Sequence, residues 1–239
     1  MAEPTFSNVR EYVANRLDKA SIDPRESPED AFNVMINACN DYIVSANHAK
    51  IEDHEYHYIT SIRIADMVNA SHRMYLEQVS EIASEAEQFS VSKDAVMGFA
   101  ERSGRYTIGN TVTLIYSMAY ELIYDMLGKL VRKLVDDDLP NSGKNAIVSQ
   151  IGSYEGRAET LVACDIVDSD RLDDIKHVAD VRAALVHDVE ERFTLSVLDD
   201  LNKINILSEL INDLYNMVYT IPIFKYHDDL ELEDLIDNR

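Results

Sequence analysis

The sequence predicts an all-α fold: an antiparallel helical bundle with additional N-terminal helices. Glycine and proline are scarce, with 7 and 5 among 239 residues, whereas a many-turned β-sandwich or a glycine-rich nucleotide-binding fold needs more of both. Apolar residues make up 46% of the chain, enough for a sizeable core. They recur every three or four residues over long stretches, which is the spacing of one helix face.

Local start and stop signals divide the first half of the chain. The run Ser21-Ile22-Asp23-Pro24 ends a short amphipathic helix, and Ser27-Pro28 supplies an N-cap followed by a proline suited to the first helical position. Ser92 begins another short helix, which we expect to end near Gly104. The helices expected in this half cover about 5–20, 27–50, 53–88 and 92–104.

The second half contains the longest regular apolar stripe and therefore the longest predicted helix, over about 107–135. The stripe consists of Ile108, Val112, Ile115, Ala119, Leu122, Met126, Leu130 and Leu134. One or two short helices joined around Gly152 and Gly156 follow. A helix capped by Asp168-Ser169-Asp170 comes next, and a last long helix ends at Pro222. We expect an N-terminal helical region over 1–105, a bundle over 106–222 and an acidic tail over 223–239.

The charge of the chain is strongly acidic, with 44 acidic against 22 basic residues, a net charge of −22 and a pI near 4.5. Such a charge repels the phosphates of nucleic acids over most of the surface, which argues against a protein that coats DNA by non-specific binding. Asp outnumbers Glu and Arg outnumbers Lys, as in proteins of salt-loving organisms. At molar salt the Debye length falls to about 3 Å, so self-repulsion is screened. We interpret the acidity as a halophilic adaptation.

Cysteine usage and hydropathy predict a soluble, cytoplasmic protein. Cys39 and Cys164 lie far apart, each inside a helical pattern, and are expected to be buried free thiols. No basic segment followed by an apolar one marks a signal peptide, and no run of 18 apolar residues predicts a membrane span. Neither a phosphate-binding glycine loop nor a Gly-x-Ser-x-Gly elbow is present, and we expect no cofactor or metal.

One short stretch, from Asp180 to Asp188, combines groups that suit phosphate chemistry. Arg182 falls on the apolar stripe of its helix, where an unpaired guanidinium costs several kcal/mol to bury. Its partner is a carboxylate of this chain, a second subunit or a ligand phosphate, which the planar guanidinium can bind through two parallel hydrogen bonds. His187 follows five residues later, and an imidazole suits proton transfer near neutral pH.

The spacing Arg182-x4-His187, in the penultimate long helix of an all-helical chain, resembles the signature of the HEPN family. The resemblance covers roughly 106–220 and leaves 1–105 without a counterpart. It departs from the family in one respect: many active members have a polar residue, often Asn, directly after the arginine, where this chain has Ala183. The resemblance implies a homodimer in which two motif helices meet at the subunit interface.

The activity that this resemblance implies is metal-independent cleavage of RNA. Arg182 would hold the scissile phosphate, and His187 would act as general base or acid, leaving a 2′,3′-cyclic phosphate and a 5′-hydroxyl. Family members often act as toxins paired with an antitoxin or in antiviral defence. Glu121, Asp125 and Asp188 are candidate supporting residues, since a carboxylate can pair with Arg182 or orient His187. For Glu121 and Asp125, solvation or a salt bridge within the bundle is the commoner outcome.

A second hypothesis is a non-catalytic helical interaction module in a defence or signalling complex. There, Arg182 pairs with an acid such as Glu121, and His187 is a surface residue. On an ideal helix, side chains five residues apart point about 140° apart, so one straight helix does not close both groups around one phosphate. A dimer interface, a bend near the helix end or the length of the arginine side chain can reconcile the two.

Three further patterns have both a structural and a functional interpretation. His54 and His57 stand at i, i+3, a spacing that can bind a metal, but a solvated helix face is the commoner outcome. A stripe of three tyrosines favours packing in the core over stacking on RNA bases. A cluster of three basic residues is typical of a helix C-terminus and favours that role over attraction of RNA. The stripe is Tyr116, Tyr120 and Tyr124, and the cluster is Lys129, Arg132 and Lys133.

Overall fold

In the part of the chain that the computed structural model describes, every regular element is a helix, which confirms the predicted all-α class. The structure describes residues 8–24, 26–45, 51–89, 92–135, 139–187 and 197–219. The helices are α1 (Val9–Ala20), α2 (Pro28–Ser45), α3 (Asp53–Phe89), α4 (Lys93–Leu134), α5 (Asn141–Ile151), α6 (Tyr154–Ala163), α7 (Ser169–His187) and α9 (Val197–Tyr219). None of them, over the residues described, is both long and apolar enough to cross a lipid bilayer.

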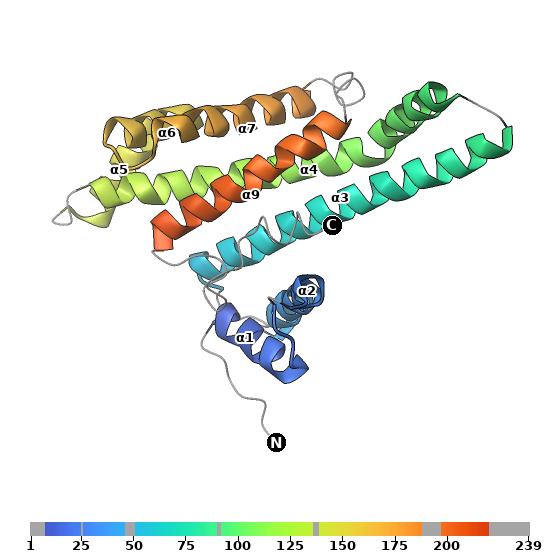
Figure 1. Ribbon diagram of the computed structural model, residues 1–239. Coiled ribbons are helices and arrows are strands. Elements are labelled where there is room, and N and C mark those ends of the chain that lie inside the picture. The colour runs from blue at the N-terminus through green and yellow to red at the C-terminus, as the bar shows by residue number, and fades with distance from the viewer. Residues whose placement is uncertain are drawn as a thin grey trace.

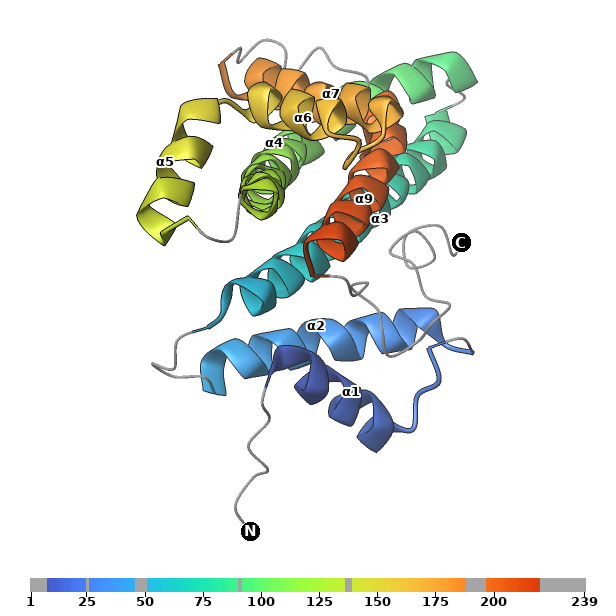
Figure 2. The same cartoon turned by 90° about the vertical axis from the view of Figure 1, so that its left-hand side faces the viewer.

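The core is built around α3 and α4, which run antiparallel as one long hairpin (Figure 1). Helix α9 packs on both of them, and α6 and α7 cover another side of α4. Helices α1 and α2 pack on each other near the start of α3 (Figure 2). The joined ends of α3 and α4 extend past the other helices (Figure 1). Most of the bundle therefore forms on the half of α4 that leads to its C-terminus.

The predicted apolar stripe of α4 is the face that enters this core. Its members from Val112 to Leu130 are all buried, whereas Leu134, at the end of the helix, is exposed. Burying side chains of this size removes most of their apolar surface from water, which stabilises each by about 1.5–3 kcal/mol relative to exposure. The two helices that pack on α4 also contribute buried apolar side chains. These are Leu207, Ile211 and Leu214 on α9, and Ile62, Ile64 and Val68 on α3.

Two expected helices are a single one in the structure. Helix α4 continues through Gly104, where the sequence predicted an end, and the expected boundary between 105 and 106 lies inside it. An isolated glycine costs a helix only about 1 kcal/mol relative to alanine, which packing along α3 can offset. The start was predicted correctly, because the Ser92 side chain accepts a hydrogen bond from the Ala95 backbone.

The chain reverses between α5 and α6 at Gly152, whose φ of 34° lies in the region that favours glycine. Gly156, the other residue expected at this joint, lies inside α6. Of the two cysteines predicted to be buried, Cys39 is buried, and desolvation raises its pKa to about 12. Cys164 is exposed because it follows the last residue of α6. The expected acidic tail, 223–239, lies outside the described residues.

A buried carboxylate connects the N-terminal helices to the bundle. Glu55, near the start of α3, accepts hydrogen bonds from the Val9 backbone at 3.1 Å and from the Tyr42 hydroxyl at 2.5 Å. Its other oxygen accepts from the Glu52 backbone at 3.0 Å. These three donors stabilise the Glu55 carboxylate, which is buried away from water. Glu55 thereby positions both α1 and α2 against α3.

Candidate functional site

The helix with the Arg-x4-His motif, α7, is fixed by contacts on two sides. Arg171 in its first turn forms ion pairs with Asp213 at 2.6 Å and Glu209 at 3.3 Å, both on α9. Lys176 pairs with Glu159 of α6 at 3.0 Å. The apolar side chains Ile175, Val178 and Leu185 are buried, as the sequence pattern predicted. The position of the motif is therefore set by α4, α6 and α9 together.

Arg182 is half-buried and faces α4, as its place on the apolar stripe indicated. Its guanidinium carbon lies 4.7 Å from the centre of the Tyr120 ring, a cation–π arrangement. The Nε atom is buried and has no hydrogen-bond partner among the residues that the structure describes. Within the same part of the chain, no carboxylate forms an ion pair with Arg182. The expected alternative, a pair with Glu121, is not formed.

Tyr120 belongs to a stack of three tyrosine rings. The centre of its ring lies 4.4 Å from that of Tyr154 on α6. It lies 6.3 Å from the ring centre of Tyr124, which follows one helical turn later on α4. Arg157 covers the Tyr124 ring at 3.8 Å and donates from Nη1 to the Tyr124 carbonyl at 2.9 Å. The predicted packing role of the stripe agrees with this arrangement, because tyrosine and arginine side chains of the same chain occupy the ring faces.

His187 is the last residue of α7, and its side chain is exposed. Arg182 faces α4, so within one copy of the chain the structure does not bring the two motif side chains together. The two side chains point in different directions because five residues of a helix rotate by about 500°, which leaves them about 140° apart. Asp188, the third candidate supporting residue, lies outside the described residues.

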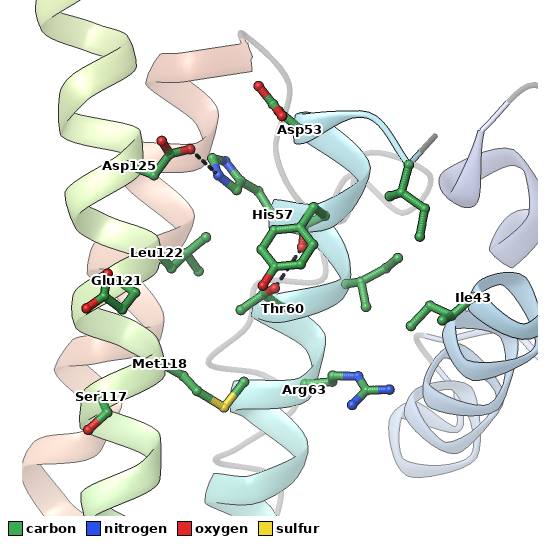
Figure 3. A pocket seen from close by; sticks show the side chains of 13 residues that line it. Ile43, Asp53, His57, Thr60, Arg63, Ser117, Met118, Glu121, Leu122 and Asp125 are labelled. Atoms are coloured by element: carbon green, nitrogen blue, oxygen red, sulfur yellow. Dashed lines mark hydrogen bonds and ion pairs between the residues drawn. The ribbon is translucent and has the colours of Figure 1, made fainter. Parts of the chain in front are cut away.

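Glu121 and Asp125 lie on a different face of α4 from Tyr120. Both line a cavity against α3, as Figure 3 shows, and neither contacts Arg182 or His187. Successive helix positions are rotated by about 100°, so these carboxylates point away from Tyr120, and their supporting role stays a prediction. Asp125 instead accepts a hydrogen bond from His57 on α3, with 2.7 Å between Oδ2 and Nε2.

His57 is the centre of a polar network that joins three helices. Its side chain is only 3% exposed, its Nε2 faces Asp125 on α4, and its Nδ1 lies 2.8 Å from the Tyr219 hydroxyl on α9. The interpretation of this segment as a solvated helix face is therefore wrong for His57. A sequence signal was present: His57 stands four and seven residues before Ser61 and Ile64, which share its buried face.

Lys129 completes the network on its solvent side. Its Nζ lies 2.7 Å from Asp53 and 3.8 Å from Asp125. The hydrogen bond from His57 and the charge of Lys129 outweigh desolvation and hold the pKa of Asp125 below its usual range. Burial and nearby carboxylates raise the pKa of Tyr219, so this hydroxyl stays protonated as a hydrogen-bond donor. The network thus holds the imidazole between a hydroxyl on α9 and a carboxylate on α4.

The other two residues of the basic cluster are also bonded within the chain. Arg132 donates to Asn145 of α5, and Lys133 donates to the carbonyls of Met217 and Val218 in the last turn of α9. These contacts favour the structural interpretation, because lysine side chains satisfy the carbonyls that a helix C-terminus leaves open.

The predicted metal alternative has no geometric support in the described part of the chain. His54 and His57 share α3, but no group of three or more His, Cys, Asp or Glu side chains is placed to hold a metal ion there. Comparison of the chain with protein-family models, with curated proteins and with solved structures gives no match.

Proposed function

We propose that the chain is an endoribonuclease of the HEPN type, in which Arg182 binds the scissile phosphate of RNA and His187 transfers protons. The observation that supports the proposal is the environment of Arg182. Its guanidinium is stacked on Tyr120, and no carboxylate among the described residues neutralises it. A half-buried guanidinium without a counter-charge favours an anion, and its planar fork matches two phosphate oxygens.

The proposed reaction needs a proton acceptor, a proton donor and a group that stabilises negative charge. The ribose 2′-oxygen attacks phosphorus as His187 removes its proton, the bond to the 5′-oxygen breaks, and that oxygen takes a proton from water as it leaves. Arg182 stabilises the charge that accumulates on the phosphoryl oxygens. The products are a 2′,3′-cyclic phosphate and a 5′-hydroxyl.

The proposal includes a homodimer in which the α7 helices of two copies meet. Arg182 and His187 point in different directions on one helix, so one copy does not close a site around a phosphate. His187 is exposed at the end of α7 and is accessible to a second copy. By its resemblance to the family, such a dimer is a toxin held by an antitoxin or an antiviral defence effector.

The experiment is RNA cleavage by the purified chain at about 2 M KCl, where a halophilic protein is folded. We expect cleavage in the presence of EDTA and its loss in His187→Ala and Arg182→Ala. Matched controls are His177→Ala, ten residues earlier on α7, and the exposed Arg73→Ala on α3; both should cleave like the native chain. Absence of cleavage by the native protein, or equal cleavage by His187→Ala, would contradict the proposal.

A second candidate function, the non-catalytic interaction module, is favoured by exposed apolar side chains of α3 and α4. Four large apolar side chains on these two helices are 41–57% exposed, and exposed apolar groups that form one patch commonly mark contact surfaces. They are Met74, Leu76, Phe99 and Leu114. If this candidate is correct, the native chain cleaves no RNA, and Arg182→Ala changes only stability.

A further inference from the structure

A cavity of about 650 Å³ lies between α2, α3 and α4, apart from the Arg-x4-His motif. Its volume is within the range of roughly 300–1,000 Å³ that is usual for small-molecule sites. Ile59 of α3 and Leu122 of α4 are buried and form its floor, and Met118 and Ile43 add apolar walls. The cavity therefore offers an apolar surface to the body of a ligand.

Among the described residues, the carboxylates that line this cavity have a cationic or imidazole partner, with the exception of Glu121. Asp53 pairs with Lys129 at 2.7 Å, and Asp125 accepts from His57 at 2.7 Å. Arg63, which is exposed, donates to the neutral amide of Asn40 of α2 at 2.9 Å and has no ion pair among the described residues. Glu121, on the α4 wall (Figure 3), forms no ion pair with any residue that the structure describes.

The aromatic residue of the cavity also favours a cation. Tyr56 is 63% exposed although it lines the cavity, so its ring is available to a ligand. An ammonium group is attracted to the face of such a ring, and more strongly where a carboxylate is close. The net charge of −22 further favours cations over anions throughout the surface.

We propose that this cavity binds an organic ammonium ion with an apolar body. The ammonium group is placed at the carboxylate of Glu121, where it forms a charge-assisted hydrogen bond. The apolar body lies on Ile59, Leu122 and Met118. The proposal is independent of RNA cleavage, because neither Arg182 nor His187 lines the cavity.

The test is isothermal titration calorimetry with three probes of matched size: 4-phenylbutylamine, 4-phenylbutanol and 4-phenylbutyrate. It uses the full chain, at the lowest salt in which circular dichroism shows native helix content, because salt screens the charge. We expect the amine to bind more tightly than the alcohol and the carboxylate not to bind. Glu121→Gln should weaken amine binding by on the order of tenfold, the usual effect of losing one charged hydrogen-bond partner.

Two further variants keep the proposal open to contradiction. Glu155→Gln, an exposed site on α6, should bind like the native chain, and Met118→Trp should fill the cavity and weaken binding of the amine and the alcohol alike. Equal affinity for the amine and the carboxylate, or unchanged amine binding by Glu121→Gln, would overturn the proposal. Absence of amine binding at millimolar concentration would do the same.

Discussion

The guanidinium of Arg182 and the ring of Tyr120 form a cation–π pair across the α7–α4 interface, with 4.7 Å between the guanidinium carbon and the ring centre. Tyr120 in turn stacks on Tyr154 of α6. The arginine is thus held on its flat face, while its edge, which carries the N–H donors, forms no ion pair among the described residues. The tyrosine ring therefore holds the guanidinium without neutralising its charge.

Tyr120 variants test whether the ring positions Arg182. We expect Tyr120→Leu to reduce the free energy of unfolding by about 1–3 kcal/mol, because both the ring stack and the cation–π contact are lost. Tyr120→Phe keeps the ring and should lose less than about 1 kcal/mol. Urea unfolding measures both. Equal losses in the two variants would show that the ring faces contribute nothing.

The Tyr219–His57 contact predicts a cost for removing one hydroxyl. Tyr219→Phe leaves the buried Nδ1 of His57 without its partner, and we expect a loss of about 1–2 kcal/mol in the free energy of unfolding. Tyr56→Phe is the matched control, since Tyr56 is largely exposed and should be nearly neutral. A Tyr219→Phe protein as stable as this control would mean that the contact is not maintained in solution.

Asp125→Asn tests how the free energy of unfolding depends on pH in the acidic range. The hydrogen bond from His57 lowers the pKa of Asp125 from an ordinary value of about 3.9. A lowered folded-state pKa stabilises the fold fully above the unfolded-state pKa, and this contribution is lost as pH falls through the folded-state pKa.

The variant should therefore be less stable than the native chain near pH 6. The expected difference is about 1 kcal/mol or less, because the Asp125 carboxylate is more than half exposed. The difference should shrink below about pH 4, where both folded and unfolded native chains become protonated. Urea unfolding across this range measures it, and a difference that grows with acidity would contradict the assignment.

Glu55 is predicted to be the polar residue on which docking of the N-terminal helices depends most. Glu55→Ala leaves the buried donors of Val9 and Tyr42 unpaired, and we expect a loss of about 2–4 kcal/mol. Hydrogen exchange of α1 amides should accelerate more than that of α4. The exposed Glu77→Ala, on the same helix as Glu55, should change neither measurement. Unchanged exchange of α1 in Glu55→Ala would refute this role.

The acidic composition predicts that salt stabilises the fold. With a net charge of −22, self-repulsion is strong in dilute buffer and is screened as the Debye length falls to about 3 Å near 1 M salt. We expect the melting temperature to rise steadily between about 0.1 and 2 M KCl. A melting temperature that does not depend on KCl would argue against the halophilic interpretation.

Local patterns in the sequence were sufficient for the helices and for most of their buried faces. The predicted helix over 53–88 is α3, Asp53–Phe89, and the stripe from Val112 to Leu130 is the buried face of α4. Caps, prolines and apolar spacing act within a few residues of one another, so they can be read from the sequence. The predicted helix end at Gly104 was wrong for a non-local reason. Glycine weakens a helix locally, but α4 continues through it while packed along α3, and this packing cannot be read from neighbouring residues.

The sequence by itself determined that this protein is helical and acidic, and that Arg182 lies on an apolar face. Only the tertiary structure decided that Arg182 stacks on Tyr120, that Asp125 binds a buried His57, and that Glu121 faces a cavity. The physical reason is that a side chain's partner depends on which helices meet and at what rotation. Contacts between helices join residues far apart in the chain, up to the 162 positions between His57 and Tyr219, and the spacing of residues within one helix does not specify them.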